Sequence, residues 1–314
     1  SNIDAAVEFA HLIPGHNKGV GQTGNAYIDD FEGTISLIDL RNFASWGLAS
    51  IPQLQPGLFP EASLSDDRTL GYNRAKIAWY ILDPLFFRND NLTPDNVNNT
   101  RHYQREVTEN EVFPDRELPA GTPANIATLD ISFFPRDRGP YNYDVEPTPN
   151  LSAGIDPATG ELNDPESRWS GIQRAINTTD FEQTNVEFIQ FWVMDPYNSD
   201  NRQFVGTQGN PEAKLLVNIG NVSEDVLRDG QMSFENGLPL NPDNPNGLDT
   251  DTTNWARVPL TQSIVNAFDN TTNSNTAQDV GFDGFDDDGE RVYFAEFLDR
   301  ITALPGVAPS VIDE

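Results

Sequence analysis

The segment Thr-Leu-Asp-Ile-Ser-Phe-Phe, residues 128–134, is the part of the chain that best indicates the fold class. Its apolar side chains alternate with polar ones, which is the period of two of a strand that buries one face. The alternation predicts a half-buried strand whose inward side chains are Leu129, Ile131 and Phe133.

Further strand patterns lie on both sides of this segment. Residues 214–219 repeat the alternation, and residues 26–31 and 75–82 are rich in strand-forming side chains. Residues 186–193, Val-Glu-Phe-Ile-Gln-Phe-Trp-Val, are apolar on nearly both faces, which is typical of a central strand covered on both sides. Many short strands separated by long loops rich in Gly, Pro, Asn and Asp predict a mainly β fold, a β-sandwich.

A few short helices are also expected. Ser223, followed by acidic residues and by Gly230 as a stop, predicts one helix. Apolar residues at helical spacing predict a second over residues 290–304, and residues 261–268 form a third candidate. The resulting division is an N-terminal extension over 1–25, a β-sandwich domain with long insertions over 26–260, and an acidic loop with a helical C-terminal segment over 261–314.

Composition narrows the range of functions. The chain has 49 Asp and Glu residues against 19 Lys and Arg, a net charge of −30 that would repel a phosphate backbone, so no nucleic-acid partner is expected. It has no cysteine, which excludes disulfides and thiolate metal sites. The longest apolar run, residues 77–82, is too short to cross a bilayer as a helix, so the segment is expected not to span a membrane. Because it opens on Ser1 with no signal-like stretch, we expect a piece of a longer chain.

Motifs for catalysis are weak. The sequence has no Gly-x-Ser-x-Gly elbow and no His-Glu-x-x-His pair, and carboxylate pairs arise easily among so many acids. We therefore predict a protein that is not an enzyme and carries no organic cofactor.

Calcium is the expected metal, because hard cations prefer six to eight oxygen ligands and neutralise crowded carboxylates. Two acidic clusters are candidates, the first made of Asp29, Asp30 and Glu32, and the second containing Asp283, Asp286 and Asp288. The alternative for the second is a solvated acidic turn that caps the following helix, where negative charge is favourable.

Aromatic residues suggest a surface for partners. Trp79 and Trp192 lie in apolar runs and are predicted to belong to the core, whereas Trp169 follows a polar loop and is predicted to be exposed. The segment 133–143 mixes arginines and tyrosines around Pro135 and Pro140, which suits an ordered interface or a loop fixed by arginine–carboxylate pairs. The predicted partner-binding residues are Arg136, Arg138, Tyr141, Tyr143 and Trp169.

Several blocks of the chain resemble the SprA/Sov family, the outer-membrane translocon proteins of the type IX secretion system that gliding motility requires. The longest is Thr-Asp-Phe-Glu-Gln-Thr-Asn-Val-Glu-Phe-Ile-Gln-Phe-Trp-Val-Met-Asp-Pro, residues 179–196. The others are Ala-Tyr-Ile-Asp-Asp-Phe-Glu-Gly at 26–33, Trp-Gly-Leu-Ala-Ser-Ile-Pro at 46–52, Arg-Gly-Pro-Tyr-Asn-Tyr-Asp at 138–144, Asn-Ile-Gly-Asn-Val-Ser-Glu-Asp-Val-Leu at 218–227 and Asp-Val-Gly-Phe-Asp-Gly at 279–284.

The resemblance implies a domain in the cell envelope, at the outer membrane and exposed to the cell surface or the periplasm. It implies contacts with other secretion-system proteins and exported cargo at a pore, and no catalytic residues. Family members are much longer and form a large β-barrel. This chain lacks their lipid-facing pattern of ten-residue alternating strands, so we expect a domain outside the membrane of a membrane-spanning parent.

The region from Trp169 to Pro196, with the strand pattern at 214–219, also resembles a carbohydrate-binding jelly roll. This likeness implies a jelly-roll-like sandwich, with structural calcium near an early Asp/Glu pair. The alternative function is therefore an extracellular carbohydrate-binding module, although a fold alone does not show sugar binding.

Overall fold

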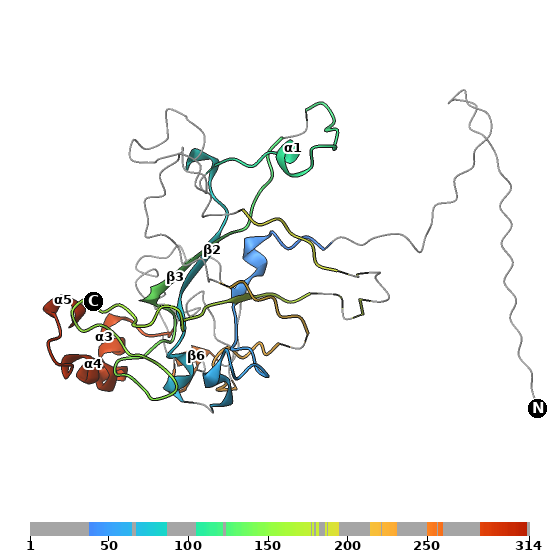
Figure 1. Ribbon diagram of the computed structural model, residues 1–314. Helices are drawn as coiled ribbons and strands as arrows, with labels where there is room; N and C mark the ends of the chain where they lie inside the picture. The colour runs from blue at the N-terminus through green and yellow to red at the C-terminus, as the bar shows by residue number, and fades with distance from the viewer. Residues whose placement is uncertain are drawn as a thin grey trace, which may run out of the picture. The chain divides into compact units, whose positions relative to one another are not determined.

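The computed structural model describes thirteen stretches of the chain (Figure 1). They are residues 38–64, 67–86, 105–121, 124–176, 178, 180–181, 186, 188–194, 214–220, 222–230, 250–255, 257–259 and 283–312. The chain divides into two compact units, residues 1–39 with 176–191, and residues 40–175 with 192–314. Most of the described residues belong to the second unit.

Small antiparallel sheets and short helices make up the described structure. The strands are β1 (Gly47–Leu48), β2 (Ala75–Tyr80), β3 (Asp130–Arg138), β4 (Ile172–Gln173), β5 (Thr250–Thr252) and β6 (Arg257–Pro259). They pair as three two-stranded sheets, β1–β4, β2–β3 and β5–β6. The helices are α1 (Glu109–Val112), α3 (Asp287–Tyr293), α4 (Ala295–Thr302) and α5 (Pro309–Ile312), with single 3-10 turns at Phe43–Ser45, Pro60–Ser63, Arg68–Gly71 and Pro84–Phe86. Within the described ranges these sheets do not form a clear sandwich.

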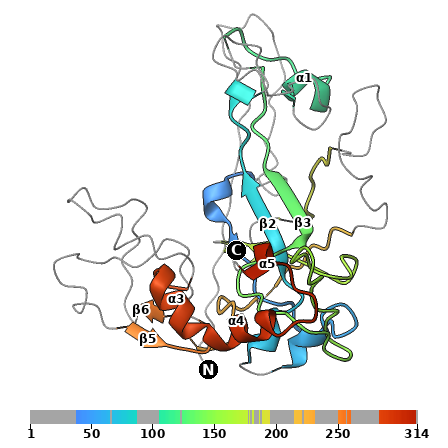
Figure 2. The same cartoon turned by 90° about the vertical axis from the view of Figure 1, so that its left-hand side faces the viewer.

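The β2–β3 pair is the longest sheet, and both of its strands were predicted (Figures 1 and 2). Ile77 pairs with Phe133 and Trp79 with Ile131, so these four side chains share one face. The predicted burial of that face is wrong, because Ile131 and Phe133 are 49% and 43% exposed. A two-stranded ribbon has no second layer of its own, so alternation alone does not bury the apolar side.

Two other predicted strands are not formed by the described residues. The described parts of 186–193 and of 214–219 have no ladder partner there, although their composition is strand-like. Trp192 is 68% exposed and Leu215 is also 68% exposed, so the predicted core position of Trp192 is wrong. A strand requires a paired backbone as well as suitable side chains, and a single sequence does not show the pairing.

The predicted helix over residues 223–230 is wrong. Ser223 Oγ accepts a hydrogen bond from the Asp225 amide at 3.2 Å, and the Asp225 carboxylate accepts from the amides of Leu227, Arg228 and Gly230 at 3.3, 2.8 and 3.0 Å. These local side-chain bonds satisfy the amides without a helix, as Ser and Asp often do.

The predicted helix over 290–304 is confirmed in part, as α3 and α4 in succession (Figure 2). The two are interrupted at Phe294, whose φ of −98° and ψ of 20° fall outside the helical region. The strand predicted at 26–31 and the helix predicted at 261–268 lie outside the described residues. Among the residues described, none of the helices combines the length and apolar character needed to cross a membrane.

Two apolar clusters form the core of the second unit. The first contains Leu48, Ile51, Phe59, Leu70, Tyr141, Val226, Leu227 and Trp255. The second contains Ala75, Val145, Ile155, Leu162, Ile301 and Val311, so α4 and α5 each place one buried side chain in it. The two clusters bring together segments that are far apart in sequence, at the end of the β2–β3 ribbon where Ala75 pairs with Arg138.

Candidate functional site

Three segments, residues 72–75, 138–144 and 168–169, meet in a group of buried polar side chains. We call this group the buried arginine network, and it consists of the buried residues Asn73, Arg74, Asn142, Asp144 and Arg168 together with the partly buried Arg138. Backbone bonds join the segments first, with the Trp169 amide donating to Asn73 O at 3.1 Å and the Ala75 amide donating to Trp169 O at 2.9 Å. Gly139 permits this approach, because a Cβ there would lie 2.4 Å from Ala75 O.

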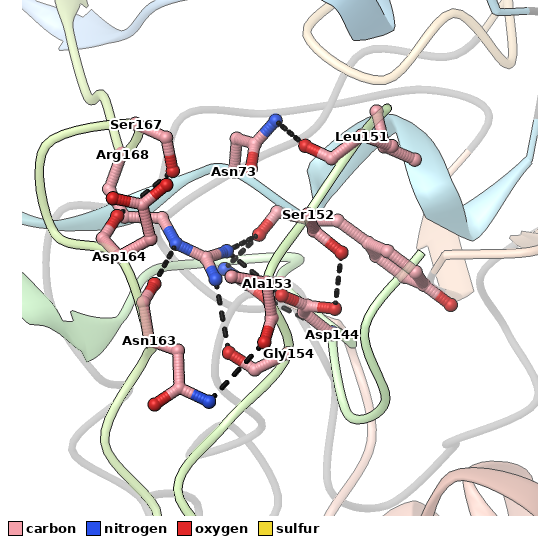
Figure 3. A network of polar contacts seen from close by, with 12 residues as sticks. Asn73, Asp144, Leu151, Ser152, Ala153, Gly154, Asn163, Asp164, Ser167 and Arg168 are labelled. Atoms are coloured by element: carbon pink, nitrogen blue, oxygen red, sulfur yellow. Dashed lines mark hydrogen bonds and ion pairs between the residues drawn. The ribbon is translucent and has the colours of Figure 1, made fainter. Parts of the chain in front are cut away.

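Arg168 lies at the centre of the network (Figure 3). Its Nη1 donates to Asp144 Oδ2 at 2.9 Å and to Tyr72 O at 2.6 Å. Its Nε donates to Asn163 O at 2.9 Å and its Nη2 to Gly154 O at 3.0 Å. The Arg168 and Asp144 side chains are both 0% exposed. A buried ion pair is tolerated when further hydrogen bonds surround it, and here the surrounding acceptors are main-chain carbonyls.

Asn142 and Arg138 fix the loop that supplies Asp144. Asn142 Nδ2 donates to Tyr72 O at 2.9 Å and to Arg74 O at 2.6 Å, while its Oδ1 accepts from the Asp144 amide at 2.9 Å. Arg138 Nη1 donates to the carbonyls of Asn142 and Asp144, each at 2.8 Å. Burial lowers the pKa of Arg138 to about 10, and the nearby Asp144 carboxylate opposes that shift. The guanidinium therefore remains charged at neutral pH.

Arg74 and Trp169 extend the network toward the first core cluster. The Arg74 guanidinium lies 4.7 Å from the centre of the Trp169 ring, its Nη1 donates to Ala49 O at 2.8 Å, and burial lowers its pKa to about 10. The Trp169 indole donates to Glu61, which is fully buried and accepts from Asn73 Nδ2 at 3.2 Å. Trp169 is thus half-buried and hydrogen-bonded rather than displayed to solvent.

The predicted partner-binding residues therefore have different surroundings. Arg138, Tyr141, Tyr143 and Trp169 contribute to the interior, and Tyr141 is 6% exposed. Arg136 is on the surface, with its Nη1 3.5 Å from Glu161. The geometry around Arg138 favours the other interpretation of this segment, a loop fixed by arginines.

Tyr141 also has an unusual backbone. Its φ of +62° is rare for a bulky residue, and the ring packs edge-on against Trp255 at 6.4 Å. The favourable packing of a core ring offsets the cost of this conformation. Tyr141 was predicted as a partner-binding residue of a loop fixed by Pro135 and Pro140, whereas its side chain lies in the core.

Most of the buried arginine network was not predicted from the sequence. Asn73, Arg74, Asn142, Asp144 and Arg168 lie in polar stretches that read as exposed loops. A usable signal was the excess of arginine over lysine, since arginine suits buried bidentate pairing. The hydrogen bonds of Arg168 and Asp144 described above all go to other groups of the protein. As arranged, the network therefore binds segments of the polypeptide chain to one another rather than a substrate.

The second acidic cluster has a different geometry from a calcium cage. Asp286 caps α3, accepting from the Gly289 amide at 2.9 Å, and Asp288 pairs with Arg291 at 3.1 Å with its side chain 95% exposed. Asp283 Oδ1 accepts from the Phe285 amide at 3.1 Å. Among the described residues, no group of three or more His, Cys, Asp or Glu side chains is placed to hold a metal ion. Asp29, Asp30 and Glu32 lie outside the described residues.

Asp283 and Glu290, the latter a residue of α3, form a hydrogen-bonded carboxyl pair. Burial raises the pKa of Asp283, and burial together with repulsion from Asp283 raises the pKa of Glu290. A raised pKa in the folded chain means that the stabilising contribution is complete at acidic pH and is lost as the pH rises through the folded-state pKa. We therefore expect the pair to favour folding more on the acidic side of its titration than at neutral pH.

The measurement is the melting temperature as a function of pH for wild type and Asp283→Asn. Asparagine keeps the oxygen that accepts from Phe285, and it stays neutral, so the variant gains on wild type as the pH rises above the carboxyl range. Asp288→Asn is the control, because Asp288 is exposed, and its curve should run parallel to that of wild type. Parallel curves for Asp283→Asn as well would contradict the coupled titration.

Comparisons with known proteins give no family for this chain. A scan against models of protein families finds no match. A search of curated proteins also finds no matching relative.

Proposed function

We propose that this chain is a non-enzymatic domain of an outer-membrane protein-export translocon of the type IX secretion system, and that it acts through protein–protein contacts at the pore. Its partners in this proposal are other secretion-system proteins and exported cargo. The location is the cell envelope, at the outer membrane and facing the cell surface or the periplasm. The resemblance of the sequence blocks supplies the family, and a jelly-roll-like sandwich is part of the proposal.

The functional part of this proposal is supported by one observation, the exposure of several large apolar side chains. They belong to a scaffold that the buried arginine network stabilises. Leu215, Val217 and Ile219 are 68%, 55% and 58% exposed, and they lie in one extended segment. Contiguous exposed apolar side chains are typical of surfaces that bind other proteins. The buried arginine network meanwhile joins residues 138–144 to Arg168 and so supports an ordered scaffold for this surface.

The proposal is tested in the native host. A strain whose gene carries Leu215→Ser, Val217→Ser and Ile219→Ser together is expected to retain the protein at the outer membrane and to lose export of a reporter cargo and gliding. A strain with Arg291→Ala, a change at an exposed ion pair outside the predicted partner-binding residues, measures the effect of an ordinary surface substitution. Normal export and motility after deletion of the whole gene would reject the proposal.

A carbohydrate-binding module is the second candidate, and the exposure of Trp192 favours it. An indole that is 68% exposed presents a flat apolar surface on which a sugar ring can stack. A glycan array probed with the chain in the presence of calcium tests this candidate, and an array without signal would remove it.

Calcium binding belongs to the proposal through Asp29, Asp30 and Glu32. A ligand that binds only the folded chain stabilises it, so a calcium chelator is expected to lower the melting temperature. The double variant Asp29→Asn/Asp30→Asn should lose this response, whereas Asp286→Asn/Asp288→Asn should retain it, since asparagine also caps helices. A melting curve that excess chelator leaves unchanged in wild type would eliminate calcium.

A further inference from the structure

The β2–β3 ribbon presents an apolar face that the described structure leaves partly open. We call it the ribbon face, and it consists of Ile77, Trp79, Ile131 and Phe133, joined as two cross-strand pairs. The opposite face carries the polar residues Lys76, Asp130 and Ser132 together with Ala78, Tyr80 and Phe134, and Tyr80 Oη lies 2.8 Å from Ser132 Oγ. An antiparallel pair with one wholly apolar face and one mixed face is typical of a sheet whose apolar side is covered.

Only part of the ribbon face is covered in the described structure. Ile77 packs against the first core cluster, at the end of the ribbon near the buried arginine network. Phe133, the cross-strand partner of Ile77, is nevertheless 43% exposed. Farther along the ribbon Ile131 is 49% exposed, and the adjoining Ile81 is 41% exposed. A two-stranded ribbon is marginally stable alone in water, so a covering layer would stabilise it.

The end of the ribbon farthest from the network is acidic. The Ile126 amide donates to Val107 O at 2.9 Å, which joins the approach to β3 with the segment 105–121 (Figure 2). That segment has five carboxylates against two arginines. Both arginines are already engaged, Arg105 with Glu111 and Arg116 with Glu109. Exposed carboxylates remain at Asp115 and Glu117.

We propose that the ribbon face binds an amphipathic helix of a partner protein whose polar side is rich in lysine and arginine. A helix satisfies its own backbone hydrogen bonds, so it can lie on a sheet face, whereas a strand laid there would leave its amides and carbonyls unpaired. The acidic segment 105–121 complements the positive charge of such a helix. A second copy of this chain is disfavoured as the partner, because each copy carries a net charge of −30.

This inference deepens the proposed function by naming a partner chemistry and its surface. The test uses the full chain and a fluorescent peptide of about 18 residues in which leucine and lysine follow the helical period, a length that supports a helix once bound. Fluorescence anisotropy is expected to show saturable binding, and a peptide with glutamate in place of lysine is expected not to bind. A strand-period peptide of valine and lysine should bind more weakly than the helical one.

Phe133 and Phe134 provide a matched pair of variants. They are adjacent and 43% and 41% exposed, but they lie on opposite faces of β3. Phe133→Ser is expected to weaken binding of the leucine–lysine peptide by about tenfold or more, as for a central apolar contact, and Phe134→Ser by about twofold at most. Circular dichroism and the melting temperature establish that both variants are folded.

Four results would overturn the proposal. They are equal loss in the two variants, binding of the glutamate peptide at the same affinity, tighter binding of the strand-period peptide, and self-association of the free chain through Phe133 in sedimentation velocity. Each can occur while export in the native host still depends on Leu215, Val217 and Ile219, so failure here is distinguishable from failure of the proposed function.

Discussion

Arg168→Ala is expected to destabilise the chain by about 3–5 kcal/mol, since it leaves a buried charge without its partner. Asp144 would keep its bond from Ser152 Oγ at 2.8 Å but lose the guanidinium at 2.9 Å. Three main-chain carbonyls, those of Tyr72, Gly154 and Asn163, would each lose one hydrogen bond at the same time. Tyr72 O would keep the bond from Asn142 Nδ2, and Gly154 O the bond from the Asn163 amide. Unfolding in urea, followed by circular dichroism, measures the change.

Arg136→Ala is the matched control. Its ion pair with Glu161 joins two side chains that are 57% and 49% exposed, and such pairs contribute about 0–1 kcal/mol. A double-mutant cycle of Arg168→Ala with Asp144→Asn should show that the two losses are not additive, because both remove the same interaction. If Arg168→Ala unfolds with the same midpoint as Arg136→Ala, the buried arginine network does not hold the fold.

Local patterns in the sequence predicted several strands and helices, since each pattern depends only on residues that are close along the chain. The alternation at 128–134 and the apolar run at 75–82 correspond to β3 and β2, and the helical spacing after Gly289 corresponds to α3 and α4. These patterns succeed because they need only a favourable local backbone and one apolar side. They did not show which side is covered, as the exposure of Phe133 demonstrates.

The buried arginine network could not be predicted in the same way. Arg168 and Asp144 are 24 positions apart, and Arg168 bonds to Tyr72 O across 96 positions. Hydropathy assigns such residues to the surface, since an isolated buried charge is costly. Only the three-dimensional arrangement brings a carboxylate and main-chain carbonyls around the guanidinium. The acidic cluster of Asp283, Asp286 and Asp288, predicted as a calcium site, illustrates the converse, because these carboxylates are close in sequence but bind different partners.

Trp255 is a second example of a buried side chain that local sequence patterns do not reveal. It was not among the tryptophans predicted to belong to the core. Its neighbours Thr252, Thr253 and Asn254 are polar, so no apolar run marks it. In the structure it is 0% exposed and lies in the first core cluster, 6.3 Å from the Tyr143 ring and 6.4 Å from the Tyr141 ring.

Trp255→Ala is therefore expected to destabilise the chain by about 3–5 kcal/mol, the usual loss when a large aromatic core side chain leaves a cavity. Trp192→Ala, the same substitution at a side chain that is 68% exposed, should stay within about 0.5 kcal/mol of wild type. The free energy of unfolding from urea titration measures both. Equal losses at the two positions would mean that the surroundings of Trp192 are as closely packed as those of Trp255. A large loss of stability at Trp255 alone would show that the contacts of its indole with Tyr141 and Tyr143 contribute strongly to the stability of this acidic chain.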